Sequence, residues 1–487
     1  MSMKKFNLLL MIVIVACLLF SSSQTALAGP PPGSWASGIA CQNLNQTEVA
    51  NLELNFYQEG NASAVLTYTD SIAAGGSKGW YTPDITNLAS AFIGSVVISS
   101  NTELSCNVNT TYGGQLGTLA SPYRIGTSSG FSDLQTSPTL YAPQVEKNFA
   151  GGWNSYIAIQ NSSLSDVTVD ITYSNRNGAA VPAADESYTI HGQTNKVVYQ
   201  NDNAGIPDGF LGSAKVTATD GTTKLAAVVN FYNNGSASTS SQFLSYNAMS
   251  SGGEKLFVPY LVRNYAGYNG GLSIQNIGTV ATSVTITFVF GTHTYTYNSA
   301  SIPIASALAL YTPDVDVLDP VDALPSNQRA GSATIEADTA GAEIVAIVNQ
   351  SNFGGPGIPL ERIGQGAAYN AVVNGTQANN VFLPQIPRRA GGIFSGGFQI
   401  TNTTNVAGTC TLTYAGVAAA TETDVPLPAN GVISRYGPSV TNLPDGFNKG
   451  VTVECTQPVV AIANLAADPG TGKVGDSFTQ SNAINTP

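Results

Sequence analysis

Four aspartates close together in the sequence are the best candidates for a metal site. Asp314, Asp316, Asp319 and Asp322 fall within a nine-residue segment that also contains Pro320. Carboxylate oxygens are ligands that calcium prefers, and calcium takes six to eight oxygens. The spacing does not match an EF-hand loop, and Asp and Pro are also typical of solvated turns. Calcium is therefore the one cofactor that the sequence suggests, with a solvated loop as the alternative.

Aromatic side chains next to glycines form a second candidate site. Trp153 follows Phe149-Ala-Gly-Gly, and Tyr265-Ala-Gly-Tyr268 occupies the corresponding place further along, with 268 − 153 = 115. Flat, partly apolar rings can stack on sugars, which makes Trp153, Tyr265 and Tyr268 candidate ligands for a glycan. The same rings can instead cap the end of a β-sandwich or pack between modules, and packing is the favoured interpretation.

The other reactive side chains do not form a recognisable catalytic set. The two histidines, His191 and His293, lie far apart and at different points of the repeat described below. They offer no material for a zinc site or a catalytic triad. We find no glycine-rich phosphate loop or nucleophile elbow, and none of the 30 acidic residues has a recognisable glycosidase setting. We therefore expect no enzyme activity and assign no catalytic residue.

The N-terminus has the pattern of a secretory signal peptide. Lys4 and Lys5 precede an apolar run from residue 6 to residue 20, and Ala26-Leu27-Ala28 supplies a small-x-small cleavage site. We expect cleavage after Ala28, with lipoprotein processing at Cys17 as the alternative. The apolar run is too short to span a bilayer comfortably, and nothing after Ala28 reads as a transmembrane segment. The sequence thus predicts a protein that is secreted, or held non-covalently at the cell surface.

The charge balance argues against nucleic acid as a partner. The chain has 18 basic and 30 acidic residues, so without the two lysines of the signal peptide the net charge is 16 − 30 = −14. An acidic chain with few charges has no electrostatic footprint for a phosphate backbone. The many Gly, Asn, Ser and Thr residues disfavour helices, while the β-branched and aromatic residues favour strands.

An internal repeat organises the chain after the signal peptide. One short strand motif ends at Asn43, Asn161, Asn276 and Asn402, at intervals of 161 − 43 = 118, 276 − 161 = 115 and 402 − 276 = 126. An alternating strand follows each copy, as in Val169, Ile171 and Tyr173, and strict alternation indicates an antiparallel sheet with one buried face. A later apolar strand ends in Asn109, Asn230, Asn349 and Asn464.

Short strands separated by Gly, Pro, Asn and Asp turns predict an all-β chain of four tandem β-sandwiches. The pattern resembles the immunoglobulin-like modules that are repeated in bacterial secreted and surface proteins. The resemblance covers nearly the whole mature chain but rests on no diagnostic signature. Each module is long enough to bury its own core, so we expect independent modules in a row. The expected modules span residues 29–138, 139–254, 255–376 and 377–487.

Four cysteines remain after the signal peptide, and an even number in an exported protein predicts two disulfides. Four cysteines allow three pairings, and the repeat chooses among them. Superposing the copies places Cys41 and Cys106 in the first module and Cys410 and Cys455 in the fourth, all on strands. We therefore predict the bonds Cys41–Cys106 and Cys410–Cys455.

One type of strand occurs three times for four modules. It contains Leu140-Tyr-Ala-Pro-Gln-Val145, Leu256-Phe-Val-Pro-Tyr-Leu-Val262 and Val381-Phe-Leu-Pro-Gln-Ile386. The first module has only Gly29-Pro-Pro-Pro32 in that place; counted the other way, the fourth module lacks a closing strand. A strand-short end leaves an edge for pairing with another chain, unless the terminal module closes adequately without it.

Two functions remain open from the sequence. A structural or adhesive surface protein that self-associates by strand addition agrees with four similar modules and the missing catalytic set. A secreted carbohydrate-binding protein agrees with the aromatic turns, with or without calcium. The expected partner is accordingly another copy of the chain, a surface protein or a glycan.

Overall fold

The computed structural model describes residues 35–90, 92–112, 123–133, 135–150, 152–233, 242–472 and 474–486. The expected signal peptide, with its cleavage site and Cys17, lies outside the described residues, as does the Gly29–Pro32 segment. Regular structure is almost entirely antiparallel strand, and the described helices are short 3-10 turns. None of these helices has the length and apolar character needed to cross a bilayer. The prediction of an all-β chain with several antiparallel sheets is confirmed.

The described strands form seven sheets around four hydrophobic cores, and we call the four groups of strands units 1 to 4. Unit 1 contains β1 (Trp35–Asn43), β2 (Ala50–Gln58), β3 (Leu66–Ile72), β4 (Ser77–Tyr81), η1 (Thr82–Asp84), β5 (Gly94–Ser100), β6 (Leu104–Tyr112) and β7 (Arg124–Ser129). Unit 2 contains β8 (Thr139–Lys147), β9 (Trp153–Asn161), β10 (Val167–Asn175), η2 (Pro182–Ala184), β11 (Glu186–Ile190), β12 (Asn195–Tyr199), η3 (Gln200–Asp202), β13 (Phe210–Ala218), β14 (Leu225–Asn233) and β15 (Phe243–Asn247).

Units 3 and 4 repeat this order. Unit 3 contains β16 (Lys255–Val262), β17 (Tyr268–Asn276), β18 (Val284–Phe290), β19 (His293–Asn298), β20 (Ala307–Tyr311), η4 (Thr312–Asp314), η5 (Asp316–Ala323), η6 (Ser326–Gln328), β21 (Ala330–Ala337), β22 (Ile344–Asn352), η7 (Leu360–Arg362), β23 (Gly366–Asn370) and β24 (Val372–Val373). Unit 4 contains β25 (Ala378–Arg388), β26 (Phe394–Asn402), β27 (Gly408–Tyr414), η8 (Ala418–Ala420), β28 (Glu422–Leu427), β29 (Val432–Tyr436), η9 (Gly437–Ser439), β30 (Phe447–Ala467), β31 (Phe478–Asn482) and β32 (Ile484–Thr486).

Each unit is a sandwich of an inner and an outer sheet. In unit 2 the inner sheet has the order β12-β9-β14-β15 and the outer sheet the order β11-β10-β13-β8. Apolar side chains at alternate positions of both sheets face a single core: β10 buries Val169, Ile171 and Tyr173 while the residues between them are exposed. In unit 4 the long strand β30 runs through both sheets and joins them into one.

The strand order differs from that of an immunoglobulin domain. In the immunoglobulin fold the first and second strands share a sheet, and the sixth and seventh share the other. In unit 2 the first strand, β8, pairs instead with the sixth, β13, and the seventh, β14, pairs with the second, β9. The units are therefore two-sheet sandwiches in which the first and seventh strands have exchanged sheets and the fourth strand, β11, pairs with the third, β10.

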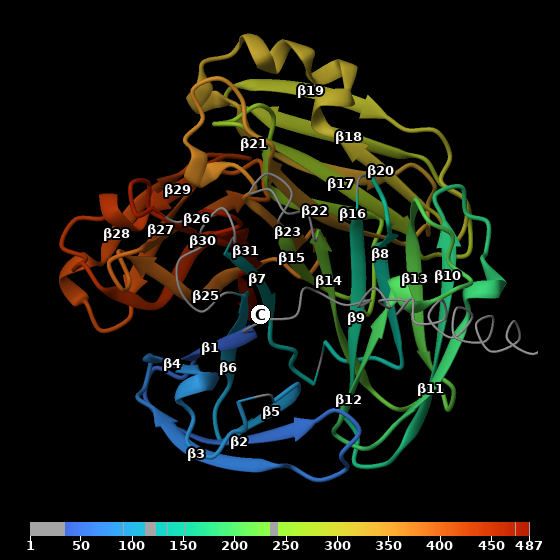
Figure 1. Cartoon of the computed structure of the whole chain (residues 1–487). Coiled ribbons are helices and arrows are strands. Elements are labelled where there is room, and N and C mark those ends of the chain that lie inside the picture. Colours follow the sequence, from blue (N-terminus) through green and yellow to red (C-terminus); the bar gives the residue numbers. More distant parts are fainter. Residues whose placement is uncertain are drawn as a thin grey trace, which may run out of the picture.

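The four units close into a ring, so the expectation of independent modules in a row is wrong. Figure 1 shows the units following one another around a centre where β7, β15, β23 and β31 lie together. Unit 4 returns to unit 1, where Gln42 Nε2 donates to Thr452 Oγ1 at 2.9 Å and Asn107 Nδ2 donates to Ser481 Oγ at 3.0 Å. The repeat correctly indicated similar units, but it carried no signal for their closure.

The structure places the strand deficit in unit 1. Its outer sheet has three described strands, in the order β3-β2-β5, whereas the outer sheets of units 2 to 4 also contain β8, β16 and β25. Within the described residues, β5 pairs with β2 and has no partner on its other edge. Of the two ways of counting that the sequence left open, the deficit at the N-terminal end applies.

Both expected disulfides are present, each between directly paired residues of neighbouring strands. Cys41 and Cys106 join β1 to β6, and Cys410 and Cys455 join β27 to β30. The bonds close loops of 65 and 45 residues. Because the ring makes units 1 and 4 neighbours, the two bonds stand on either side of the contact at which the ring closes.

Replacing Cys410 and Cys455 together by alanine should lower the free energy of unfolding by about 4 kcal/mol, because the unfolded chain regains the freedom of a 45-residue loop. Chemical denaturation of the double variant and the oxidised parent protein measures the difference. Reducing the parent protein breaks both disulfides and should lower its stability at least as much. Equal midpoints for the variant and the oxidised parent would contradict the prediction.

Candidate functional site

The centre of the ring is the most extensive polar site of the described structure. The strands β7, β15, β23 and β31 are each the last strand of an inner sheet, so each brings a free edge to the axis. An edge strand presents unpaired N–H and C=O groups that need partners. Side chains of the neighbouring units provide many of those partners.

At one end of the four strands, three asparagines bind the backbone of the preceding unit. Asn247 Nδ2 donates to the Ser129 carbonyl at 2.8 Å, and the Ser129 N–H donates back to Asn247 Oδ1 at 3.1 Å. Asn370 makes the same pair of bonds to Asn247, at 2.6 and 3.2 Å, and Asn482 makes it to Asn370, at 2.7 and 2.9 Å. A carboxamide has the donor and acceptor of a peptide group, so these side chains continue the strand pairing from one unit to the next.

At the other end of the strands, one buried carboxylate ties the four units together. Asp476 of unit 4 is fully buried and accepts hydrogen bonds from the N–H groups of Phe243 in unit 2, at 2.8 Å, and Gly366 in unit 3, at 2.7 Å. Its own N–H donates to the carbonyl of Tyr123 in unit 1. Burial raises the pKa of Asp476, while these N–H groups and the positive charge of Arg124 act in the opposite direction.

Between neighbouring units, β8 and its counterparts, which have no equivalent among the described strands of unit 1, make a recurring contact. The carbonyl of Pro143 on β8 accepts from Ser273 Oγ of unit 3 at 2.9 Å, and the carbonyl of Pro259 on β16 accepts from Thr401 Oγ1 of unit 4 at 3.2 Å. The residue after the proline adds a second contact. Gln144 Oε1 accepts from Asn349 Nδ2 at 3.3 Å, and Gln385 Oε1 accepts from Asn109 Nδ2 at 2.6 Å.

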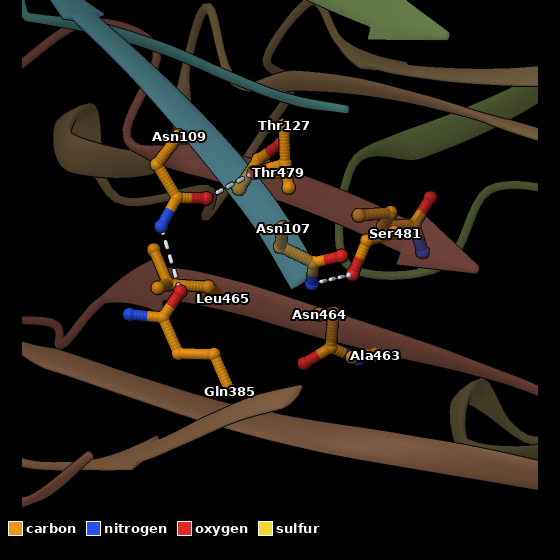
Figure 2. A pocket seen from close by; sticks show the side chains of 10 residues that line it. Asn107, Asn109, Thr127, Gln385, Ala463, Asn464, Leu465, Thr479 and Ser481 are labelled. Atoms are coloured by element: carbon orange, nitrogen blue, oxygen red, sulfur yellow. Dashed lines mark hydrogen bonds between the residues drawn. The ribbon is translucent and has the colours of Figure 1, made fainter. Parts of the chain in front are cut away.

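Figure 2 shows the contact between units 1 and 4 from close by. Asn107 and Asn109 of β6 point toward side chains of unit 4, and Thr127 Oγ1 of β7 donates to Asn109 Oδ1 at 2.5 Å. The cavity among these side chains has a volume of about 10 Å³, roughly the room that one water molecule needs. The closure of the ring is therefore a packed polar contact, with no room for an organic ligand.

A larger surface hollow, of about 310 Å³, lies between units 1 and 2. Lys196 forms an ion pair with Glu59 at 3.0 Å across this contact, and its Nζ lies 5.5 Å from the centre of the Tyr188 ring. His191 also lines the hollow and contacts Asp166 at 2.9 Å. Partly exposed ion pairs of this kind contribute about 1 kcal/mol or less, so Glu59 and Lys196 mainly orient the two units.

The structure places the candidate aromatic residues mostly in packing contacts. The Tyr268 ring lies 5.3 Å from that of Phe478 in unit 4, and its hydroxyl donates to Gln365. Trp153 packs against the core of unit 2, and Tyr265 pairs through its backbone with Tyr268 in the same turn. The structure therefore brings Tyr265 and Tyr268 together but leaves Trp153 in another unit.

The position of Tyr268 has an aromatic residue in two further units, again at a contact between units. Trp35 lies 5.0 Å from Phe243 of unit 2, and Phe394 lies 6.0 Å from Tyr123 of unit 1, between ring centres. Apolar rings at the start of β1, β17 and β26 thus join unit 1 to unit 2, unit 3 to unit 4 and unit 4 to unit 1.

The four candidate calcium ligands do not converge on one point. Arg263 Nη2 binds Asp319 Oδ1 at 2.8 Å and Asp322 Oδ2 at 2.9 Å, while its Nη1 donates to the Thr312 carbonyl. Asp314 and Asp316 are exposed on the adjoining turns. Among the described residues no group of three or more His, Cys, Asp or Glu side chains is placed to hold a metal ion.

The guanidinium of Arg263 occupies the place where a cation would meet Asp319 and Asp322. The same role recurs in unit 4, where Arg388 Nε binds Asp445 at 2.9 Å and Nη1 donates to the Val440 carbonyl. In unit 2, Lys147 Nζ donates to the Asn203 carbonyl. In units 2 to 4, a basic residue at the end of β8, β16 or β25 thus binds the segment that precedes the paired strand β13, β21 or β30.

Sequence reasoning missed the residues of the axis. Asn247, Asn370 and Asn482 each precede an alanine at the end of a short strand, and this Asn-Ala pair is the signal that was available. Asp476 had no signal, because units 1 to 3 have no aspartate that plays its part. Arg263 was missed because it lies 56 and 59 residues from the two acids it binds.

Replacing Asn370 by alanine should lower the free energy of unfolding by about 2–3 kcal/mol, because two hydrogen bonds between units 2 and 3 are lost. Urea denaturation measures the loss. The matched control is Asn177→Ala, whose exposed side chain makes no described hydrogen bond, and its effect should be within about 0.5 kcal/mol. Equal stabilities of the two variants would rule out a structural role for the asparagine ladder.

The stability of the protein should depend on pH through Glu146, a buried residue of β8. Burial raises the pKa of Glu146 to about 7, against the hydrogen bond from Gln144, which lowers it. Between about pH 4.5 and 7 the folded state then holds a proton that the unfolded state has released. Stability should fall by up to about 3 kcal/mol as the pH rises through this window.

The variant Glu146→Gln cannot ionise and should lose this component of the pH dependence. Denaturation at pH 4.5, 6 and 8 tests it, with Glu53→Gln on the exposed face of β2 as the control. A profile for the Glu146→Gln variant as steep as that of the parent would show that another group is responsible.

No family model matches the sequence, and no curated protein matches it. Among solved structures, Thermotoga maritima 1070 shares 17% identity at a TM-score of 0.19, covering 25% of this chain and 96% of that one. A tetra-tandem repeat from the extending region of a large adhesion protein shares 11% identity at a TM-score of 0.10, covering 92% and 95%. The pilus backbone protein RrgB of Streptococcus pneumoniae shares 10% identity at 0.13, covering 78% and 86%. Likeness at this level carries no argument about the fold or function of this chain.

Proposed function

We propose that this protein is an exported structural or adhesive component of the cell surface or its surroundings, without enzymatic activity or a required cofactor. The observation that carries the proposal is that its buried polar side chains form hydrogen bonds between units. Asn247, Asn370, Asn482 and Asp476 all hold units to one another at the axis. The most elaborate polar chemistry of the described chain therefore serves the assembly of a rigid ring.

Two further features support export. Disulfides persist in oxidising compartments outside the cytoplasm, and the chain carries one in unit 1 and one in unit 4. The N-terminal pattern around Lys4, Lys5 and Ala28 is that of a secretory signal. The free edge of β5 provides a place for association by strand addition, with a second copy or another surface protein.

Localisation in the host of origin tests this proposal. Immunogold labelling with an antibody against the mature chain should mark the cell envelope or the surrounding matrix, and deletion of the gene should reduce attachment or cohesion of the cells. Complementation with the full-length gene controls for polar effects. Labelling confined to the cytoplasm would contradict the proposal.

A carbohydrate-binding function is the alternative, and a glycan array separates the two. The ring of Tyr268 is engaged with Phe478, so we expect no specific glycan signal from the mature protein, in calcium or in a chelator. Binding of a defined glycan that is lost on Tyr265→Ala or Trp153→Ala would establish the alternative instead.

A further inference from the structure

The outer sheet of unit 1 ends where the other three units continue. In units 2, 3 and 4 the strand that corresponds to β5 pairs on its outer edge with β8, β16 or β25. The corresponding edge of β5 has no partner within the described residues. A free edge of this kind offers a row of backbone donors and acceptors to an added strand.

The core of unit 1 is open along the same edge. Val96 and Ile98 of β5 pack against the core but remain partly exposed. Their counterparts beside β8, which are Ala214 and Val216, are 1% and 0% exposed. Val108 of β6 is likewise partly exposed, whereas its counterpart Val229 is fully buried. Val96, Ile98 and Val108 therefore form a partly exposed apolar strip beside β5, in the place that β8, β16 and β25 cover in the other units. We call this strip the groove of unit 1.

The neighbouring unit completes the groove with a polar group. Asn349 binds Gln144 of β8 and Asn109 binds Gln385 of β25, each across a contact between units. The counterpart that faces unit 1 is Asn230 of unit 2. Its Oδ1 accepts from Ser245 Oγ, but its Nδ2 has no hydrogen-bond partner among the described residues. The donor that would meet a glutamine on the added strand is thus already in position.

We propose that the groove of unit 1 binds an extended strand of another polypeptide, and that this strand carries the pattern shared by β8, β16 and β25. The pattern is apolar-x-apolar-Pro-Gln-apolar, as in Leu140, Ala142, Pro143, Gln144 and Val145; β25 repeats it, and β16 has Tyr260 in place of the glutamine. The inference rests on the proposed function and names the partner chemistry of its strand-addition site.

Each position of the pattern has a counterpart in the groove. The apolar residues of the three resident strands are buried: Leu140, Ala142 and Val145, then Leu256, Val258 and Leu261, then Val381, Leu383 and Ile386. They would cover Val96, Ile98 and Val108. Proline lies at a break in strand register in all three resident strands, where a missing N–H costs no ladder hydrogen bond. The glutamine would accept from Asn230.

The expected cleavage after Ala28 would remove the segment of this chain that corresponds by repeat interval to β8. Counting back by the repeat interval, Thr139–Lys147 corresponds to residues 21–29, since 139 − 118 = 21 and 147 − 118 = 29. Cleavage after Ala28 removes nearly all of that segment. The remaining residues 29–34 include three prolines and no apolar alternation, and proline has no N–H to donate.

A peptide-binding measurement tests the proposal directly. The mature protein, residues 29–487, is titrated into a fluorescein-labelled peptide with the sequence of Ala378–Arg388, which carries the pattern, and anisotropy is recorded. Saturable binding is expected. A control peptide with aspartate in place of the residues equivalent to Leu383 and Ile386 should bind at least about tenfold more weakly, because two apolar contacts are replaced by buried charges.

Two protein variants locate the site. Ile98→Lys places a charge in the groove and should weaken binding of the parent peptide by about tenfold or more. Ser99→Lys, on the exposed face of the same strand, should leave binding unchanged. Near-ultraviolet circular dichroism confirms that both variants fold. Equal binding by the two variants would overturn the assignment of the site to β5.

A variant that carries the added strand in its own chain tests the same site even where the separate peptide binds weakly. The sequence of Thr139–Lys147 is placed directly before Pro30, in register with β8. This protein should melt at a higher temperature than the mature chain and should no longer bind the peptide. Absence of both peptide binding to the mature chain and a rise in melting temperature would overturn the proposal.

Size-exclusion chromatography with light scattering then separates this inference from the proposed function. Oligomers of the mature chain that disappear when the strand is supplied in cis would show that a second copy can act as donor. Oligomers that persist would place association elsewhere and count against the groove. A surface location without any strand binding would leave the structural function standing and remove only this inference.

Discussion

The ring depends on one constraint: four sheet edges meet at its axis, and the backbone groups on those edges need partners away from solvent. The solution differs at the two ends of the strands. Asn247, Asn370 and Asn482 each imitate a peptide group toward the preceding unit. Asp476 uses one carboxylate to accept from two units at once. Arrangement around an axis therefore turns four exposed edges into a single buried contact.

The same constraint explains why the units are not equivalent. Three steps of the asparagine ladder follow the chain, but Ser129 stands where a fourth amide would reach from unit 1 to unit 4. That contact uses the backbone hydrogen bond from Asp476 to Tyr123 and the side chains of Gln42, Asn107 and Asn109. It is also the only junction between successive units that no peptide linker spans. The two disulfides lie in the two units that meet there.

Much of the individual unit could be predicted from the sequence, because strand periodicity and repeat spacing are local properties. The alternation of Val169, Ile171 and Tyr173 marks a half-buried strand without further context. Superposing the copies sufficed to pair Cys41 with Cys106, because it assigned both cysteines to strands of the same unit. The exchange of β8 and β14 between sheets had no such signal, because both strands are apolar and read alike.

The sites were harder to predict, because they depend on residues brought together from distant parts of the chain. The acids from Asp314 to Asp322 resembled a cation site in the sequence, because Arg263, which binds two of them, lies far away along the chain. The aromatic turn at Tyr268 resembled a sugar platform until Phe478 of another unit was placed against it. The spacing of residues within one segment identifies side chains that could bind a ligand. Whether another side chain of the same protein already contacts them depends on the tertiary structure.

The place of Asp476 near the end of the chain has a consequence for biogenesis. Units 1 to 3 are synthesised first, yet the carboxylate that accepts from Phe243 and Gly366 is added only with the strands that follow β30. Asn107 and its partner Ser481 are separated by 374 residues. The entropic cost of bringing two strands together grows only slowly with the number of residues between them. The contact between Asn107 and Ser481 nevertheless cannot form until β31 has been synthesised. A chain truncated before β31 would keep the edges of β7 and β23 uncovered, and such edges invite aggregation and degradation. The edges of β7 and β23 are therefore covered only in a chain that contains β31.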